Sequence, residues 1–255
     1  MDGIHASIIA EQVGEWGSIP ITNTLIMSWI VLALLIIGAI IVRARLTLYP
    51  GKLQVFLELL IGTAYQYVEE VLESKALARR YFPFLMTIFL FILTANMLEF
   101  IPGVGSIGLF AESHGVAAEL GHSEFIPLLR SLATDLNMPL ALAIIAFIVI
   151  EVAGMRTFGF FRDMSRFFNF HSPLAFLVGI IELVSEFIRL ISFSFRLFGN
   201  IFAGEVLIAV ALFFTPYIIP VPFMAFEVFV GFIQAAIFAM LTLFFIKLAV
   251  TEAAH

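Results

Sequence analysis

The stretch FSFRLFGNIFAGEVLI, Phe193 to Ile208, places Arg196 inside a long apolar segment. Most residues between Pro173 and Pro216 are Phe, Leu, Ile, Val, Ala or Gly, which is typical of a membrane-spanning helix. A guanidinium stays protonated at physiological pH, and in mid-bilayer it costs about 2.5–3.5 kcal/mol on insertion scales. A charge of that cost predicts a function and a partner for Arg196.

Composition places the chain among polytopic membrane proteins. Of its 255 residues 62% are hydrophobic and 30 are Phe, and the mean hydropathy is +1.10. The net charge of −6 argues against nucleic acid as a partner. The chain has no cysteine, which excludes disulfides, thiolate nucleophiles and cysteine metal sites. Acidic residues among the first 22 predict that no secretory signal peptide is present.

We expect one all-α integral membrane domain over residues 1–255, with five transmembrane helices and one interfacial amphipathic helix. The surface helix is expected where Leu and Phe alternate with several Glu residues, a mixture too charged to span. The expected order is an outer N-terminal segment (1–23), span 1 (24–42), the surface helix (51–80), span 2 (83–101), an outer loop (102–137), span 3 (138–155), a cytoplasmic loop (156–171), a long helix (172–214) and the last span (223–250).

The long helix has two possible arrangements. Its roughly 43 residues would extend about 65 Å, twice the thickness of the hydrocarbon core, so it is either strongly tilted or broken near Gly199. The short connection TPYIIPVP predicts that this helix and the last span form an antiparallel hairpin. Ten basic residues fall on one side if the long helix crosses once, and Arg130 alone falls on the other. This asymmetry favours one tilted helix, with the N-terminus outside and the C-terminus in the cytoplasm.

A polar stripe runs along the long helix. Its members follow one another at steps of three or four residues, which places them on one helical face: Glu182, Ser185, Arg189, Ser192, Arg196 and Asn200. Such a stripe cannot face acyl chains and must face protein or water. For Ser185 and Ser192, hydrogen bonds across a helix–helix seam are an equal alternative.

The order of charges suggests two access paths. Antiparallel pairing would bring Glu227 of the last span toward Glu205, and Gln234 toward Asn200 and Arg196. Carboxylates would then lie on the outer and the inner side of Arg196. This arrangement is what two offset aqueous paths for a proton or cation would require.

These residues resemble the a-subunit family of rotary F-type ATP synthases. The motif FRLFGNIFAGE, followed by FIQAAIFAMLTLFFIKLA, carries the resemblance, and PGKLQ, LTANMLEFIPG and TDLNMPLALA also match family positions. The resemblance covers nearly the whole chain. It implies two long slanted helices that curve around a ring of c subunits.

The resemblance assigns roles to individual residues. It implies that Arg196 is the essential charge facing the ring. The outer half-channel would comprise Asn200, Glu205, Glu227 and Gln234, and the cytoplasmic half-channel Glu182, Ser185, Arg189 and Ser192. The chain departs from relatives at Glu227, where some carry histidine, and at Arg189, where some carry lysine.

The resemblance also implies partners and a location. The partners would be the c ring, b-type peripheral stalk subunits and the lipid bilayer, without direct nucleotide binding. The chain would be non-catalytic and would need no cofactor, and its translocated ion would be H⁺, with Na⁺ as the alternative. A bacterial inner membrane fits best, with an organelle inner membrane as the alternative.

Three residues, Asn96, Glu99 and Asp135, could form the outer mouth of the outer path, and each also has a second interpretation. Asn96 and Glu99 near the end of span 2 could line the outer path or meet lipid headgroups. Asp135 precedes span 3, where an N-cap is the first interpretation and a channel mouth the second. The competing functions for the whole chain are a stand-alone ion channel or secondary transporter, and a scaffold for an electron-transfer complex.

Overall fold

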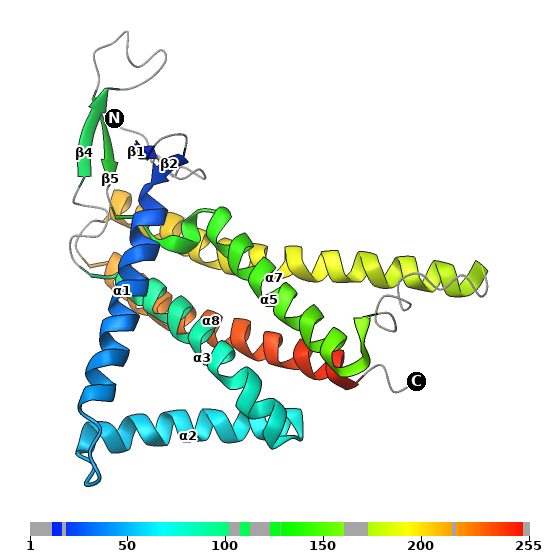
Figure 1. Cartoon of the computed structure of the whole chain (residues 1–255). Helices are drawn as coiled ribbons and strands as arrows, with labels where there is room; N and C mark the ends of the chain where they lie inside the picture. The colour runs from blue at the N-terminus through cyan, green and yellow to red at the C-terminus, as the bar shows by residue number, and fades with distance from the viewer. Residues whose placement is uncertain are drawn as a thin grey trace. The chain divides into compact units, whose positions relative to one another are not determined.

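The computed structural model describes residues 12–16, 19–101, 108–112, 123–127, 129–160, 173–215 and 218–251 (Figure 1). Within these ranges the chain forms six α-helices: α1 (Asn23–Ala44), α2 (Lys52–Leu72), α3 (Lys75–Leu98), α5 (Asn137–Phe158), α7 (Pro173–Phe214) and α8 (Pro220–Thr251). Two short antiparallel hairpins, β1 (Gln12–Trp16) with β2 (Ile19–Thr22) and β4 (Gly108–Glu112) with β5 (Ser123–Pro127), and the 3₁₀ turn η1 (Leu132–Thr134) complete the described part. Most of the expected cytoplasmic loop and much of the outer loop lie outside the described residues.

Five of the helices are long and apolar enough to cross a bilayer. They are α1, α3, α5, α7 and α8, each with at least 22 residues. The helix α2 is amphipathic, and its N-terminal half leaves Leu53, Phe56 and Leu59 exposed. The expected class, an all-helical membrane protein with five spans and one further amphipathic helix, is confirmed. The two hairpins were not expected.

The boundary between the surface helix and the second span differs from the expectation. The helix α2 ends at Leu72, whereas the sequence analysis extended it to Arg80. It ends because Glu73 adopts a left-handed conformation with φ 52°, which stops the helical ladder. The next helix, α3, starts at Lys75 and continues through Pro83, which was expected to begin the span. Pro83 lacks a backbone N–H and its ring crowds the preceding turn, yet α3 continues through it, as membrane helices commonly do.

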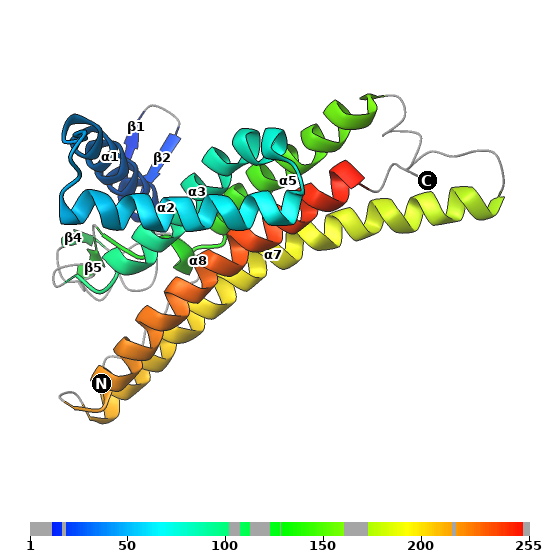
Figure 2. The same cartoon turned by 90° about the horizontal axis from the view of Figure 1, so that it is seen from below.

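The long helix crosses Gly199 without a break. The α7 helix has 42 residues and extends about 63 Å, so the two-pass alternative is wrong. It packs against α8, and Figure 2 shows the two helices running alongside each other. The pairing is antiparallel, because Phe193 contacts Phe238 whereas the later Asn200 contacts the earlier Gln234. The expected hairpin is confirmed, and its tilt in a membrane stays a prediction.

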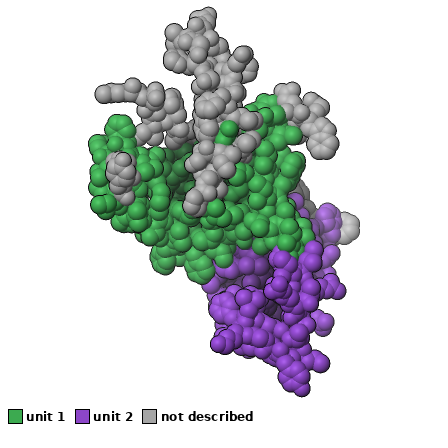
Figure 3. Space-filling model, turned by 90° about the vertical axis from the view of Figure 1, so that its left-hand side faces the viewer, with its two compact units in different colours: residues 1–37, 91–139, 197–234 green, residues 38–90, 140–196, 235–255 purple. Residues whose placement is uncertain are grey.

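The chain divides into two compact units, coloured in Figure 3. Unit 1 comprises residues 1–37, 91–139 and 197–234, and its core cluster contains Met27, Val31, Ala95 and Leu132. Unit 2 comprises residues 38–90, 140–196 and 235–255. Its core cluster joins the end of α2 to α3, α5 and α8 through Val68, Leu72, Ala78, Tyr81, Leu85, Ile150, Ala153, Leu243 and Ile246. Buried alanines in both units allow helix backbones to approach closely.

Candidate functional site

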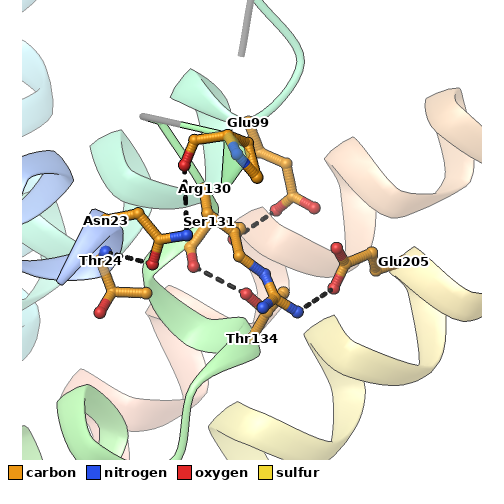
Figure 4. A network of polar contacts seen from close by, with 8 residues as sticks. Asn23, Thr24, Glu99, Arg130, Ser131, Thr134 and Glu205 are labelled. Atoms are coloured by element: carbon orange, nitrogen blue, oxygen red, sulfur yellow. Dashed lines mark hydrogen bonds and ion pairs between the residues drawn. The ribbon is translucent and has the colours of Figure 1, made fainter. Parts of the chain in front are cut away.

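A cluster of ionisable side chains lies in unit 1. Glu99 follows α3, Arg130 and Ser131 precede η1, and Glu205 belongs to α7. The guanidinium of Arg130 lies 3.7 Å from the carboxylate of Glu205, and the hydroxyl of Ser131 donates to Glu99 at 2.7 Å (Figure 4). The first distance is that of an ion pair and too long for a direct hydrogen bond. The cluster therefore joins three parts of the chain that are distant in sequence.

Arg130 is the member of this cluster that sequence reasoning missed. Its side chain is 9% exposed, although it follows a loop rather than a span. In the sequence, Arg130 stands out only as the single basic residue on the expected outer side. Its position as one cation among several outer carboxylates was the signal that could have identified it, because such a cation is expected to pair with one of them.

Glu227 of α8 is packed against the backbone of α7. A Cβ atom built at Gly204 would overlap the carboxylate of Glu227. Glu227 is 4% exposed, and its Oε1 atom has no hydrogen-bond partner among the described residues. Glycine at position 204 is thus the residue that makes room for this carboxyl group, next to Glu205 in sequence.

Two amide side chains hold the same region of unit 1 together. The amide of Asn200 donates to the side-chain oxygen of Gln234 at 2.8 Å, which links α7 to α8. The amide of the buried Asn96 donates to the carbonyl of Gly231 at 3.0 Å, which links α3 to α8. A Cβ atom at Gly231 would lie 3.0 Å from that of Asn96, so these helices are in close contact. Of the expected mouth residues, Asn96 is therefore a buried helix-to-helix contact in this chain.

Glu99 has an unusual proton affinity for a glutamate. Burial raises its pKa from 4.5 to about 7, and the nearby Glu205 and Glu227 add to the rise. The hydrogen bond from Ser131 and the charge of Arg130 act in the opposite direction. A carboxyl group with this pKa can exchange protons near neutral pH.

Asp135 makes the contacts of a helix cap. Its carboxylate accepts from the backbone N–H of Asn137, the first residue of α5, at 3.0 Å, and from the Asn137 side chain at 3.2 Å. It also accepts from the hydroxyl of Thr24 in α1 at 3.3 Å. The neighbouring Asn23 accepts from the backbone N–H of Thr24 and donates to the carbonyl of Pro127 (Figure 4). These contacts favour the capping interpretation of Asp135.

Arg196 belongs to unit 2 and lines an open pocket of about 270 Å³. The pocket is lined by Ser185, Ile188, Arg189, Ser192, Phe193, Arg196, Leu241 and Phe245. Its guanidinium donates to the hydroxyl of Ser192 at 3.4 Å, a long contact. Within the described part of the chain, no carboxylate forms an ion pair with Arg196.

Arg189, the other arginine of the polar stripe, interacts with side chains of its own unit. Arg189 forms a 2.7 Å ion pair with the buried Glu186, and its guanidinium lies 4.0 Å from the ring centre of Phe245. Glu182 lies partly buried in α7, and Ser185 donates to the carbonyl of Ile181 in its own helix. Among the described residues, Arg189 therefore forms an ion pair whereas Arg196 forms none.

Comparisons with known proteins agree with the resemblance noted from the sequence. The family described as ATP synthase A chain matches residues 25–247. The ATP synthase subunit a of Mycobacterium tuberculosis is 34% identical over 256 residues, covering 95% of this chain and 96% of that protein. The ATP synthase subunit a of Moorella thermoacetica is 30% identical over 235 residues, covering 92% of this chain and 94% of that protein.

The chain belongs to the ATP synthase A chain family. As a member of this family it is a non-catalytic, ion-translocating membrane subunit of the ATP synthase. A further relative, from Propionigenium modestum, is named as a sodium-ion-specific subunit a. It is 32% identical over 237 residues, covering 92% of this chain and 76% of that protein.

The two sets of residues that are expected to form the half-channels belong to different units of the chain. The outer set, Asn200, Glu205, Glu227 and Gln234, lies in unit 1. The inner set, Glu182, Ser185, Arg189 and Ser192, lies in unit 2 together with Arg196. Among the described residues, no group of three His, Asp or Glu side chains is arranged to hold a metal ion.

Proposed function

We propose that this chain provides two offset half-channels for protons, and that Arg196 faces the membrane carboxylates of a rotating ring of c subunits. One observation carries the proposal. Arg196 lines an open pocket without a carboxylate of the described chain to neutralise it. A cation in a membrane helix requires a negative partner, and a carboxylate on a second subunit supplies one.

Arg196 acts as an electrostatic barrier between the two paths. It favours the ionised form of a ring carboxyl group that passes it, because opposite charges attract in a medium of low polarity. It cannot relay a proton itself, because a guanidinium does not lose its proton in proteins. Protons must therefore travel with the ring, and direct leakage between the half-channels is blocked.

The outer half-channel comprises Asn200, Glu205, Glu227 and Gln234. Its polar side chains gather where α7 and α8 pack, and the ionisable Glu99 and Arg130 lie in the same unit. A proton entering here neutralises a ring carboxylate, and only the neutral form can cross the lipid-facing part of the rotation. The mouth of this half-channel includes Asn96, Glu99 and Asp135, which also make the contacts described above.

The cytoplasmic half-channel comprises Glu182, Ser185, Arg189 and Ser192. Ser185, Arg189 and Ser192 line the pocket that contains Arg196, and Glu182 precedes them in α7. A ring carboxyl group releases its proton on this side. The driving free energy is about 2.3 kcal/mol per elementary charge per 100 mV, in addition to any pH difference.

The partners and the location follow from the same proposal. The chain contacts the c ring and b-type stalk subunits within the ATP synthase of a bacterial inner membrane, with its N-terminus outside. The relatives from Moorella and Mycobacterium support a bacterial setting. The ion is H⁺, and the sodium-specific relative makes Na⁺ the alternative to test.

The test is made in the whole ATP synthase reconstituted in vesicles. Arg196→Ala abolishes coupled ATP synthesis, and Arg196→Lys also fails because an ammonium lacks the permanent charge and planar fork of a guanidinium. Arg79→Gln, which removes an exposed arginine of α3, serves as the matched control and leaves synthesis unchanged. Proton pumping by Arg196→Ala at the rate of the parent complex would refute the proposal.

A second measurement separates this proposal from a stand-alone channel or transporter. The purified chain is placed in vesicles without other subunits, and dye-reported proton and sodium fluxes are recorded. We expect no ion-selective flux from the chain alone, because the ring carries the ion between the half-channels. In the whole complex, synthesis is expected to proceed without added sodium.

A further inference from the structure

A buried ion pair adjoins the pocket that contains Arg196 in unit 2. Arg189 lines that pocket together with Arg196, whereas Glu186 is not among its lining residues. The Glu186 carboxylate accepts from the Arg189 guanidinium at 2.7 Å, and the Glu186 and Arg189 side chains are 8% and 22% exposed. A carboxylate outside the pocket is thus paired with a cation that reaches it.

We propose that Glu186 is a positioning residue that neutralises Arg189, so that Arg196 is the one uncompensated cation among the described residues that line this pocket. The inference rests on the proposed function, because it requires that ring carboxyl groups pass this pocket. It gives a role to a carboxylate that the spacing of the polar stripe did not include.

The two arginines are placed to act on the same group. Arg189 and Arg196 are seven residues apart, which is about 10.5 Å along α7 and nearly the same helical face. Charges at about this distance are only partly screened in 0.1 M salt, and less so in apolar surroundings. Two uncompensated cations would therefore stabilise an ionised ring carboxyl group over the length of the pocket, and not only at Arg196.

The contacts of Arg189 hold its guanidinium beside Glu186. The two residues are three positions apart on α7, so their side chains are neighbours on the helix surface. The ring of Phe245 in α8 lies 4.0 Å from the Arg189 guanidinium and packs edge-on against Phe193 at 5.6 Å. Removal of one partner of such a pair leaves the other charge uncompensated.

Other charged groups do not take the place of Glu186. On the α8 side the pocket is lined by Leu241 and Phe245, and the charged residue of α8 in this unit, Lys247, is paired with Glu73 of α2 at 3.2 Å. In the part of α7 that belongs to unit 2, the charged residues are Glu182, Glu186, Arg189 and Arg196. Glu182 lies seven residues before Arg189 and does not line the pocket.

The proton step shows what a second free cation would change. In ATP-driven pumping, a ring carboxylate takes a proton from a hydronium ion of the cytoplasmic water, so that an O–H bond forms and a water molecule is left. A second cation stabilises the carboxylate and opposes this uptake, which then requires a lower pH. In synthesis the ring carboxyl group gives its proton to water here, a step that the same cation favours. Loss of the Glu186 charge is therefore expected to impair pumping more than synthesis.

The test uses the whole ATP synthase in vesicles whose cytoplasmic face points outward, so that the medium sets the pH of the inner path. ATP-driven pumping is recorded against this pH and divided by the ATP hydrolysis rate of the same variant. Glu186→Gln is expected to move the pumping midpoint to lower pH by about one unit, which lowers pumping up to about tenfold above the midpoint. An assembled Glu186→Gln complex with the parent midpoint would overturn the inference.

A second comparison shows whether the shift acts through Arg189. The double variant Glu186→Gln with Arg189→Gln removes both charges and is expected to have the parent midpoint. Glu186→Asp keeps the negative charge and is expected to have the parent midpoint too. If the double variant kept the full shift of Glu186→Gln, the free Arg189 would not be its cause and the inference would fail.

A third comparison adds a cation and leaves the pair intact. Ile188 lines the pocket, and the residues three and four positions from it carry no carboxylate that could pair with a new charge. Ile188→Arg is expected to reproduce the acid shift, even if Glu186→Gln does not assemble. Ile188→Met, uncharged and similar in volume to isoleucine, is its control and keeps the parent midpoint. The same midpoint in both variants would contradict the charge argument.

Controls separate assembly from function. Each variant is first checked for copurification of the chain with the complex, and Glu70→Gln, which changes an exposed glutamate of α2 in the same unit, is expected to keep the parent midpoint. Failure of the proposed function has a different result, which is parental pumping by Arg196→Ala. If this inference alone is wrong, Arg196→Ala is inactive and Glu186→Gln has the parent midpoint.

Discussion

The carboxyl group of Glu227 in α8 lies directly against Gly204 in α7, so that a side chain at position 204 would overlap it. The glycine therefore leaves space for an ionisable group inside the membrane helix. Glycine is needed at this position for its small size, because α7 remains helical through Gly204 and needs no unusual backbone conformation there.

Gly204→Ala is therefore expected to impair proton translocation strongly. The added methyl group displaces the Glu227 carboxyl, and overpacking of this kind costs about 1–3 kcal/mol. ATP-driven proton pumping by the reconstituted complex measures the effect. Gly38→Ala is the control, because a Cβ atom at this helical glycine of α1 meets no atom within 4 Å. Equal pumping by the two variants would show that the contact is unimportant.

The hydrogen bond between Asn200 and Gln234 can be measured with a double-mutant cycle. Asn200→Ala and Gln234→Ala each remove one partner of the 2.8 Å bond, and the double variant removes both. We expect a coupling free energy of about 1 kcal/mol in the stability of the detergent-solubilised chain. Strictly additive effects would mean that the two amides do not interact in the folded protein.

Glu99 gives the chain a pH-dependent stability. Burial raises its pKa from 4.5 to about 7, so the folded chain keeps a proton that the unfolded chain has already released between these values. Stability consequently falls as the pH rises through this window. Glu99→Gln is expected to remove that slope and to stabilise the chain above pH 7, by up to about 3 kcal/mol.

The measurement is thermal unfolding of the purified protein from pH 4 to 9. Glutamine is a suitable replacement for Glu99, because its side-chain oxygen can still accept a hydrogen bond from the hydroxyl of Ser131. Glu58→Gln on the exposed face of α2 is the control and should not alter the slope. A variant Glu99→Gln with the parent pH dependence would contradict the assignment.

Periodicity and hydropathy predicted the features that depend on a single helix. The five spans follow from apolar length, and the stripe that contains Arg196 follows from its spacing in α7. The meeting of Asn200 with Gln234 was predictable because a short connection forces two consecutive helices to pair antiparallel. These are local properties that the order of residues determines.

Features that depend on distant segments were not predictable in this way. Arg130 is buried beside Glu205 of α7, and no helical spacing relates these two residues. The hairpins β1–β2 and β4–β5 lie in segments whose hydropathy gives no span. The end of α2 depends on the left-handed conformation of Glu73, a residue type that rarely adopts it.

That left-handed residue provides the last prediction. Glu73 has φ 52° and ψ 23°, a conformation that costs an ordinary L-residue about 1–2 kcal/mol and costs glycine almost nothing. Its side chain is 78% exposed and forms an ion pair with Lys247 at 3.2 Å, so the pair contributes little to stability. Glu73→Gly and Glu73→Gln both remove this pair, and only the glycine variant relieves the backbone. In detergent unfolding, Glu73→Gly is therefore expected to be about 1 kcal/mol more stable than Glu73→Gln. If the glycine variant were instead the less stable of the two, the turn between α2 and α3 would not be left-handed at this residue.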